Sequence, residues 1–252
     1  MRIDSPMTAT ALVLAAPFVG SFLGTVATRV PRLQPVLLGR SHCADCGATL
    51  GPFELVPLLS YCALGGKCRH CDATIDPMLA VIEIGATALA LWAAFTTSGI
   101  ALIASCMLGW TLLALAAIDW RERVLPDVLT LSLLAFGLIF TSAIDPGSIV
   151  DHAIGAAAGF TIFAVTALLY RLIRGREGLG LGDAKLLAAS GAWLGWIGLP
   201  STILLAALLT LGAALIQSAR GSPLKGGSSF AFGPALAAAT WLVWLYGPLV
   251  SA

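Results

Sequence analysis

Charged residues are scarce in this chain. Asp, Glu, Lys and Arg make up 11% of its 252 residues, whereas a soluble domain carries about a quarter. So few charges cannot cover the surface of a water-soluble globule, and 58% of the residues are hydrophobic. The shortage excludes a soluble protein and predicts that most of the chain lies in a lipid bilayer.

An excess of positive charge is also lacking, because the formal net charge is only +1. A protein that binds nucleic acid through its phosphates needs a basic surface, so we expect no nucleic-acid partner. Nucleotide-binding glycine patterns are missing as well: the chain has neither GxxxxGK[ST] nor GxGxxG.

Long hydrophobic runs are what the sequence has instead. Each is near the roughly 17–25 residues that span a bilayer, and they predict an all-α polytopic membrane protein with about eight transmembrane helices. A tight turn is expected in GWIGLP before Ser201, because Gly198 and Pro200 interrupt helices. The runs are Thr8–Ala27, Pro77–Thr97, Ile100–Ile118, Val128–Ala143, Ile149–Ile173, Ala184–Gly198, Ser201–Ser218 and Phe230–Val250.

Basic residues are distributed unevenly between the loops. With eight spans, thirteen of the fourteen fall on one side, and only Arg2 falls on the other. The positive-inside rule places the thirteen in the cytoplasm and both termini outside. The thirteen are Arg29, Arg32, Arg40, Lys67, Arg69, Arg121, Arg123, Arg171, Arg174, Arg176, Lys185, Arg220 and Lys225.

The longest polar insertion, residues 29–76, carries two CxxC pairs separated by 21 residues. Two such knuckles supply four thiolates for a tetrahedral metal site, and disulfides are disfavoured in the cytoplasm. We interpret them as structural zinc ligands; a redox dithiol pair and unliganded thiols are the alternatives. His42 and His70 flank the knuckles and could replace a ligand. The four cysteines are Cys43, Cys46, Cys68 and Cys71.

Three parts follow from this pattern. Residues 1–28 form a first transmembrane helix, residues 29–76 form a small cytoplasmic zinc-binding domain, and residues 77–252 form a seven-helix membrane domain. Cys106 lies in an apolar run and is expected to be a small buried hydrophobe.

Three acidic residues lie at the predicted cytoplasmic membrane face: Asp119 and Asp127 in DWRERVLPD, and Asp183 in GLGLGDAK. Two crossings separate Asp119 from Asp183, so both return to the same face. Carboxylates at such depth are costly unless paired, hydrated or functional. A pair that shares a proton can activate water, as in aspartic proteases.

Glycines precede the last of these acids. Gly178, Gly180 and Gly182 leave room for a peptide backbone and loosen the segment before Asp183. An alternative is that Asp183 only caps a helix N-terminus, and the same holds for Asp127.

The remaining polar and aromatic features have simpler interpretations. Lys185 either pairs with a carboxylate or faces the cytoplasm, and we favour the second. His152 is expected to be solvated outside. Trp193, Trp196, Trp241 and Trp244 suit an interfacial aromatic belt.

Taken together, these strings resemble the type IV prepilin peptidases, the bacterial branch of the GxGD intramembrane aspartic proteases. The resemblance covers nearly the whole chain. It rests on GSFLGTVATRVP, SHCADC…PLLSYCALGGKCRHC, PMLAVIEIGATAL, AIDWRERVLPDVLTL, GLGLGDAKLLAASGAWLG and FAFGPALAAA.

The resemblance implies that Asp119 and Asp183 are catalytic. It makes Asp127, Gly180, Gly182 and Glu83 supporting residues. It also implies cleavage of prepilin or pseudopilin leaders after a glycine at the cytoplasmic face of the bacterial inner membrane. Methylation of the new N-terminus with S-adenosylmethionine is implied too, but no residues can be assigned to that donor. Type IV pilus assembly and type II secretion are equally open.

Two other classes of function compete with this interpretation. A polytopic transporter would use intramembrane acids to carry ions, but its acids should lie nearer mid-bilayer, and no internal repeat is visible. A non-catalytic secretion assembly factor would not need both acidic motifs intact.

Overall fold

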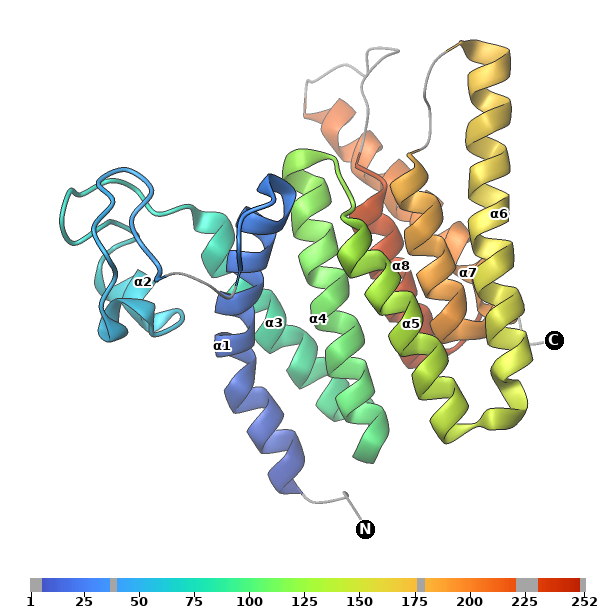
Figure 1. Cartoon of the computed structure of the whole chain (residues 1–252), viewed down its shortest axis with the longest axis horizontal. Helices are drawn as coiled ribbons and strands as arrows, with labels where there is room; N and C mark the ends of the chain where they lie inside the picture. The colour runs from blue at the N-terminus through green and yellow to red at the C-terminus, as the bar shows by residue number, and fades with distance from the viewer. Residues whose placement is uncertain (1–5, 37–39, 176–179, 221–230, 250–252) are drawn as a thin grey trace. The chain divides into compact units, whose positions relative to one another are not determined.

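The protein was examined as a computed structural model that describes residues 6–36, 40–175, 180–220 and 231–249 (Figure 1). Gly178, the basic residues Arg2, Arg176 and Lys225, and the ends of the last predicted run, Phe230 and Val250, lie outside these ranges. Apart from two isolated β-bridges, the regular structure of the described ranges is helical. The helices are α1 (Pro6–Arg29), η1 (Val30–Arg32), η2 (Pro52–Leu55), α2 (Leu59–Ala63), α3 (Pro77–Thr96), α4 (Gly99–Glu122), α5 (Asp127–Ile144), η3 (Pro146–Ser148), α6 (Ile149–Arg174), α7 (Leu181–Ala219) and α8 (Gly233–Tyr246).

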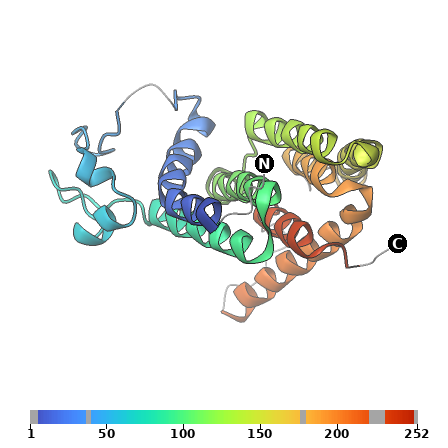
Figure 2. The ribbon, with the colours of Figure 1, turned by 90° about the horizontal axis from the view of Figure 1, so that it is seen from below.

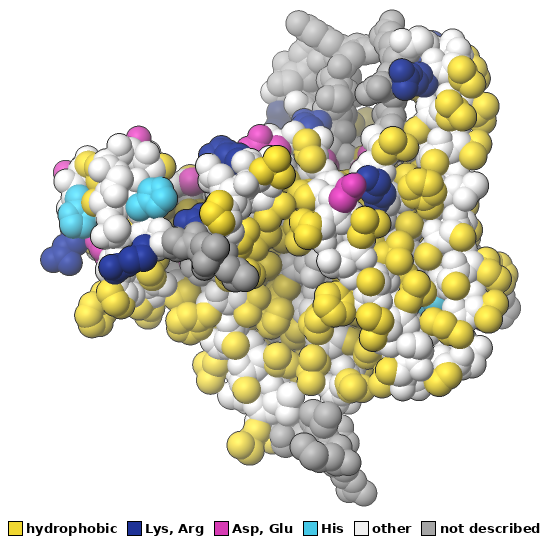
Figure 3. Space-filling model, in the orientation of Figure 1, with side chains coloured by type: hydrophobic (Ala, Val, Ile, Leu, Met, Phe, Trp, Pro, Cys, Tyr) yellow, Lys and Arg dark blue, Asp and Glu magenta, His cyan; other side chains and the backbone are white. Residues whose placement is uncertain are grey.

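Six of the described helices are long and apolar enough to cross a membrane: α1, α3, α4, α5, α6 and α7. The apolar helix α8 is shorter, with 14 residues. Every predicted run falls on a described helix, with the sixth and seventh on the same one, which confirms an all-α polytopic membrane protein. In the face shown in Figure 3, hydrophobic side chains cover α5 and α6 along their length, and charged side chains lie near the helix ends.

The sixth and seventh predicted runs both lie in α7, which is bent rather than interrupted by a loop. Gly195 has φ 68° and ψ 176°, outside the helical region, and separates two helical parts. The break falls at Gly195, the first residue of the stretch GWIGLP in which the turn was expected. A positive φ favours glycine, and the ring of His152 lies 3.6 Å from where a Cβ at Gly195 would be.

Two compact units make up the chain, residues 1–117 and residues 118–252. In the first unit, α1 packs on α3 through small residues. A Cβ at Gly20 would come within 2.6 Å of the Glu83 Cα, and one at Gly24 within 2.8 Å of Leu79. Glycines four residues apart let membrane helices approach closely.

In the second unit, α7 packs against α5, α6 and α8, and its contact with α6 is the most extensive. Figures 1 and 2 show α5, α6 and α7 side by side. Gly155 and Gly159 of α6 lie directly on the α7 backbone. A Cβ at Gly191 of α7 would lie 2.2 Å from the Gly155 carbonyl oxygen.

Because backbone meets backbone at this crossing, Gly191→Leu should force α6 and α7 apart. We expect a loss of at least about 3 kcal/mol of stability, since the clashing atoms cannot rotate away. The measurement is the melting temperature in detergent. Gly212→Leu is the matched control, because no heavy atom lies within 4 Å of a Cβ at Gly212. Equal melting temperatures for the two variants would contradict this packing.

Two of the four tryptophans assigned to an interfacial belt are instead buried. Trp193 and Trp241 are 3% and 4% exposed. The Trp193 indole N–H donates to the Leu133 carbonyl (2.8 Å), and its ring stacks on Phe140. These rings fill the core of the second unit, so the belt prediction was wrong for them.

His152 is also not solvated as expected. Its Nδ1 lies 3.0 Å from the Ala192 carbonyl oxygen and 3.2 Å from the Thr141 hydroxyl. A carbonyl only accepts, so Nδ1 carries the proton and donates to Ala192 just before the bend at Gly195. The side chain therefore binds a backbone carbonyl of α7 three residues before the bend.

Candidate functional site

A pocket of about 220 Å³ in the second unit is lined by polar groups from three chain segments. The segments are the end of α4, the turn that leads into α5, and the beginning of α7. The pocket therefore lies at helix ends rather than midway along them. Its lining residues are Asp119, Arg123, Val124, Leu125, Asp127, Gly180, Gly182, Asp183 and Lys185.

All three acids singled out from the sequence line this pocket. Asp119 lies in the last turn of α4, Asp127 is the first residue of α5 after Pro126, and Asp183 lies in the first turn of α7. A sharp reversal makes this possible: Arg123 has φ 56° and its N–H donates to the Asp119 carbonyl. The turn reverses the chain, so that α4 ends and α5 begins at the same rim of the pocket.

The carboxylate of Asp119 is held by the beginning of α8. The side chain is 7% exposed, and its Oδ2 accepts a hydrogen bond from the Gly233 N–H (3.1 Å). A Cβ at Gly233 would lie 2.6 Å from that oxygen. Residue 233 thus contributes both a donor and an empty space that the carboxylate fills.

Sequence reasoning did not assign a role to Gly233. The string FAFGPALAAA was noted as part of the family pattern, but nothing in it specifies a contact with Asp119, 114 residues earlier. The one feature of the sequence that could have pointed to Gly233 is a glycine directly before Pro234 at the beginning of a helix.

The glycines before Asp183 have different surroundings. Gly180 is the N-cap of α7, and its carbonyl accepts from the Asp183 N–H. Gly182 is already helical, and a Cβ there would lie 2.9 Å from Leu125. The expectation of a loosened segment is therefore wrong at Gly182, whose missing side chain makes room for Leu125 instead.

Asp127 forms an ion pair across the rim of the pocket. Lys185 Nζ lies 2.5 Å from Asp127 Oδ1, with side-chain exposures of 28% and 61%. The favoured prediction that Lys185 only faces solvent was wrong. The pair ties the beginning of α5 to the beginning of α7, and so fixes the helix turn that carries Asp183.

The remaining charges of the pocket bear on what it can do. Asp119 and Asp183 are close enough to repel one another, and Arg123 is near enough to attract Asp119. Two carboxyl groups that line one pocket can divide the roles of proton acceptor and proton donor. One can then accept a proton from water while the other donates one.

Glu83, the fourth acid singled out, lies in α3 of the first unit and is 8% exposed. Its Oε2 accepts a hydrogen bond from the Leu58 N–H (2.8 Å). Leu58 has φ 60°, a strained conformation for leucine. Glu83 therefore fastens the polar insertion to α3.

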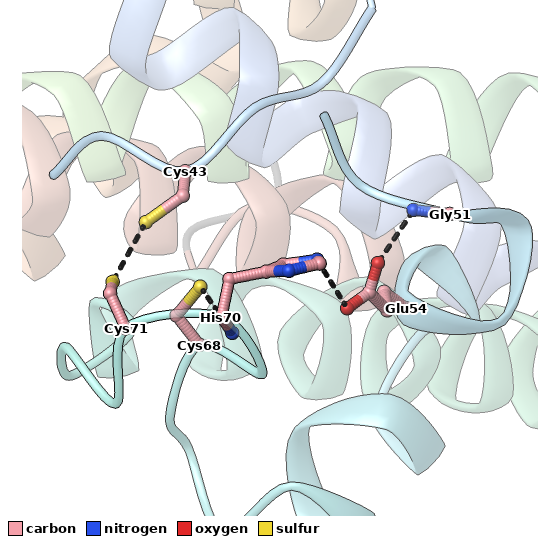
Figure 4. Close-up of polar contacts among 6 residues, drawn as sticks. All are labelled: Cys43, Gly51, Glu54, Cys68, His70 and Cys71. Atoms are coloured by element: carbon pink, nitrogen blue, oxygen red, sulfur yellow. Dashed lines mark hydrogen bonds and ion pairs between the residues drawn. The ribbon is translucent and has the colours of Figure 1, made fainter. Parts of the chain in front are cut away.

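The four cysteines form a cluster in the first unit, with their Sγ atoms all within 4.8 Å of one another. Cys43 and Cys71 Sγ are 3.8 Å apart (Figure 4). Four thiolates at about 2.3 Å from a tetrahedral zinc ion lie about 3.8 Å apart. The cluster is thus compatible with one metal ion.

Two similar turns present these thiols. The Cys43 N–H donates to Ala48 and the Gly47 N–H to Cys43; in the second turn the Cys68 N–H donates to Ala73 and the Asp72 N–H to Cys68. Gly47 and Asp72 occupy equivalent places and both have positive φ, 70° and 55°. The repeated CxxC spacing thus encodes a repeated turn.

The thiol pKa values reflect this crowding. Backbone N–H groups of Cys46 and Asp45 lower the pKa of Cys43 to about 7. At Cys71 the Ala73 N–H acts in the same direction, but loss of water and the neighbouring thiols raise its pKa to about 12. Each thiolate makes the next harder to form, and a bound cation would remove that penalty.

His70 is turned away from the thiols by an acidic partner. Its Nε2 lies 3.8 Å from Glu54 Oε1, and the other oxygen, Oε2, accepts from the Gly51 N–H (Figure 4). His70 contributes its backbone to the cluster instead, since its N–H donates to Cys68 Sγ.

Comparisons with known proteins match this arrangement. The type IV leader peptidase family matches residues 106–215, and the bacterial peptidase A24 N-terminal domain matches residues 14–97. A prepilin leader peptidase/N-methyltransferase of Pseudomonas aeruginosa is 36% identical over 95% of this chain and 90% of its own length. A relative with the same name from Burkholderia pseudomallei is 42% identical over 83% of this chain and 68% of its own length. One from Aeromonas hydrophila is 37% identical over 86% of this chain and 74% of its own length. No solved structure gave a significant match.

Fold and site together define a multi-pass membrane protein with a pocket lined by three carboxylates and with a four-cysteine cluster. This chain belongs to the type IV leader peptidase family and is therefore a membrane peptidase.

Proposed function

We propose that this protein cleaves the leader peptides of prepilins or pseudopilins, and that Asp119 and Asp183 activate the attacking water. One carboxylate takes a proton from water as its oxygen attacks the scissile carbonyl carbon. The other carboxyl group protonates the departing amide nitrogen as the C–N bond breaks. The observation that carries the proposal is that both carboxylates line one pocket, in a chain of this family.

The place of the pocket supports a substrate that is itself anchored in the membrane. Asp119 and Asp183 lie in terminal turns of apolar helices, the depth at which a substrate helix would leave the bilayer. We propose cleavage after a glycine at that boundary, on the cytoplasmic face of the bacterial inner membrane. The basic loops and the positive-inside rule support this orientation, with both termini outside.

We also propose that the new N-terminal amine is methylated. The names of the relatives from Pseudomonas and Burkholderia include N-methyltransferase activity, which supports it. S-adenosylmethionine would supply the methyl group, and the amine released by cleavage would be the nucleophile. We assign no residues of this chain to the donor.

Cys43, Cys46, Cys68 and Cys71 would hold a structural zinc ion. Four thiolates leave no open position for a water or a substrate, so the ion would organise residues 29–76 rather than take part in cleavage. Asp127, Gly180, Gly182 and Glu83 would support these sites without touching the reacting atoms.

The zinc assignment predicts about one zinc ion per chain in protein purified without chelator. Cys46→Ser should lose most of it, while Cys62→Ser, which changes an exposed cysteine outside the cluster, should keep it. Metal content should also fall as the pH falls from about 8 to 5, because protons compete for the thiolates. Elemental analysis checks both; equal zinc in the two variants would contradict the assignment.

The function is tested with purified protein and a prepilin in detergent, with and without S-adenosylmethionine. Mass spectrometry should find a cut after the leader glycine in both reactions, and a product heavier by one methyl group only when the donor is present. A prepilin that stays intact would favour the transporter or assembly-factor alternatives. A cut without methylation would remove only the second activity.

A further inference from the structure

The polar insertion contains a segment that is not polar. Residues 51–66, the apolar segment, include η2 and α2 and carry a single charged residue, Glu54. Three of its hydrophobic side chains are exposed: Phe53 at 88%, Leu59 at 70% and Leu55 at 41%. Single exposed hydrophobic residues are ordinary, but three within seven residues of an almost uncharged stretch call for a partner.

The only charged side chain of the apolar segment is largely buried. The Glu54 side chain is 12% exposed, and it is engaged by the Gly51 N–H at 2.6 Å and by His70 at 3.8 Å (Figure 4). The apolar side chains are thus left without an adjacent charge, an arrangement suited to an apolar medium.

The contact between Leu58 and Glu83 sets the depth of the apolar segment. Glu83 lies six residues after the beginning of α3, a helix long and apolar enough to span a membrane. At 1.5 Å per residue, this is roughly 9 Å along the helix from Pro77. Figure 1 agrees, since α2 lies level with the N-terminal half of α3 rather than beyond its end.

Basic residues follow the apolar segment directly. Lys67 and Arg69 are both exposed and stand within three residues of its end. Hydrophobic side chains that enter the headgroup region beside cationic ones are typical of segments that lie on anionic membranes. Figure 3 shows hydrophobic side chains at the lower edge of the insertion, with Lys and Arg side chains directly above them.

We infer that residues 51–66 lie in the boundary between headgroups and acyl chains, with Phe53, Leu55 and Leu59 buried in lipid. The partner is the bilayer that α1 and α3 cross, because the Glu83 contact holds the segment at a depth of about 5–10 Å beneath that surface. The insertion is thereby fixed to the membrane at three places: α1, the apolar segment and α3.

The test uses the full chain in vesicles of phosphatidylethanolamine and phosphatidylglycerol. The photoreactive residue p-benzoylphenylalanine replaces Phe53 or Leu59, and replaces Asp45 as a control on the exposed knuckle of the same insertion. Zinc content equal to that of the wild type shows that the insertion is folded. After irradiation, mass spectrometry identifies whatever is attached to each peptide.

Phospholipid adducts should be at least about tenfold more abundant at positions 53 and 59 than at position 45. Cross-links from position 53 or 59 to residues 118–252 would overturn the inference, because the face would then be covered by the second unit. Equal lipid adducts at position 45, or none at position 53 or 59, would overturn it as well. None of these results depends on peptidase activity.

Discussion

Gly233→Ala is expected to lower kcat for leader cleavage by about a hundredfold and to leave KM nearly unchanged. The added Cβ would come within 2.6 Å of Asp119 Oδ2, so the carboxylate must leave its place. A displacement of about 1 Å at a catalytic group costs roughly two orders of magnitude. Substrate binding does not depend on that position, and an effect confined to kcat indicates a loss in the chemical step.

Gly212→Ala is the matched control for this prediction, because it makes the same change where a Cβ meets no heavy atom within 4 Å. Its kcat and melting temperature should equal those of the wild type. The melting temperature of Gly233→Ala should also change little, since the atom that must move is the end of a side chain. Wild-type kcat in Gly233→Ala would show that the contact with Asp119 is unimportant; a rise in KM alone would place Gly233 in substrate binding.

Most of the architecture could be predicted from the sequence because it depends on local patterns. Length and hydrophobicity define the transmembrane helices, and the CxxC spacing defines the cysteine turns. The bend in α7 lies in the stretch GWIGLP where a turn was expected, and it falls at the first residue of that stretch. The stretch holds two glycines, and its local pattern does not tell that Gly195 rather than Gly198 takes a positive φ.

The buried tryptophans show a second limit. In a membrane helix, the face toward lipid and the face toward other helices are both apolar, so hydrophobicity does not tell which one a side chain occupies. Trp193 was therefore placed at the interface, although its N–H donates to Leu133 inside the second unit.

Asp119 and Asp183 could be identified from the sequence because two membrane crossings separate them, which places both at the same face of the membrane. The details around them were not accessible in this way. The ion pair joins Lys185 to Asp127, which are 58 positions apart. The hydrogen bond joins Gly233 to Asp119, which are 114 positions apart. Such contacts depend on how helices pack, which no local pattern in the chain records.

The largest effect is expected from the aspartates themselves. Asp119→Asn and Asp183→Asn should each lower kcat by about 10⁴-fold or more, because asparagine keeps the shape of the side chain but cannot exchange the proton. The double variant should be no slower than either single variant, since groups that act as one unit are not additive. If the loss of kcat in the double variant equals the product of the two single losses, the two carboxylates do not work as a pair.

The central claim is tested most directly by following cleavage of a purified prepilin by the wild type, Asp119→Asn and Asp183→Asn. Asp145→Asn, which changes an exposed acid in the same unit, serves as the control. The account predicts that the wild type and the control release the leader, while both other variants bind the prepilin and leave it intact. Cleavage at the wild-type rate by Asp119→Asn or Asp183→Asn would contradict it.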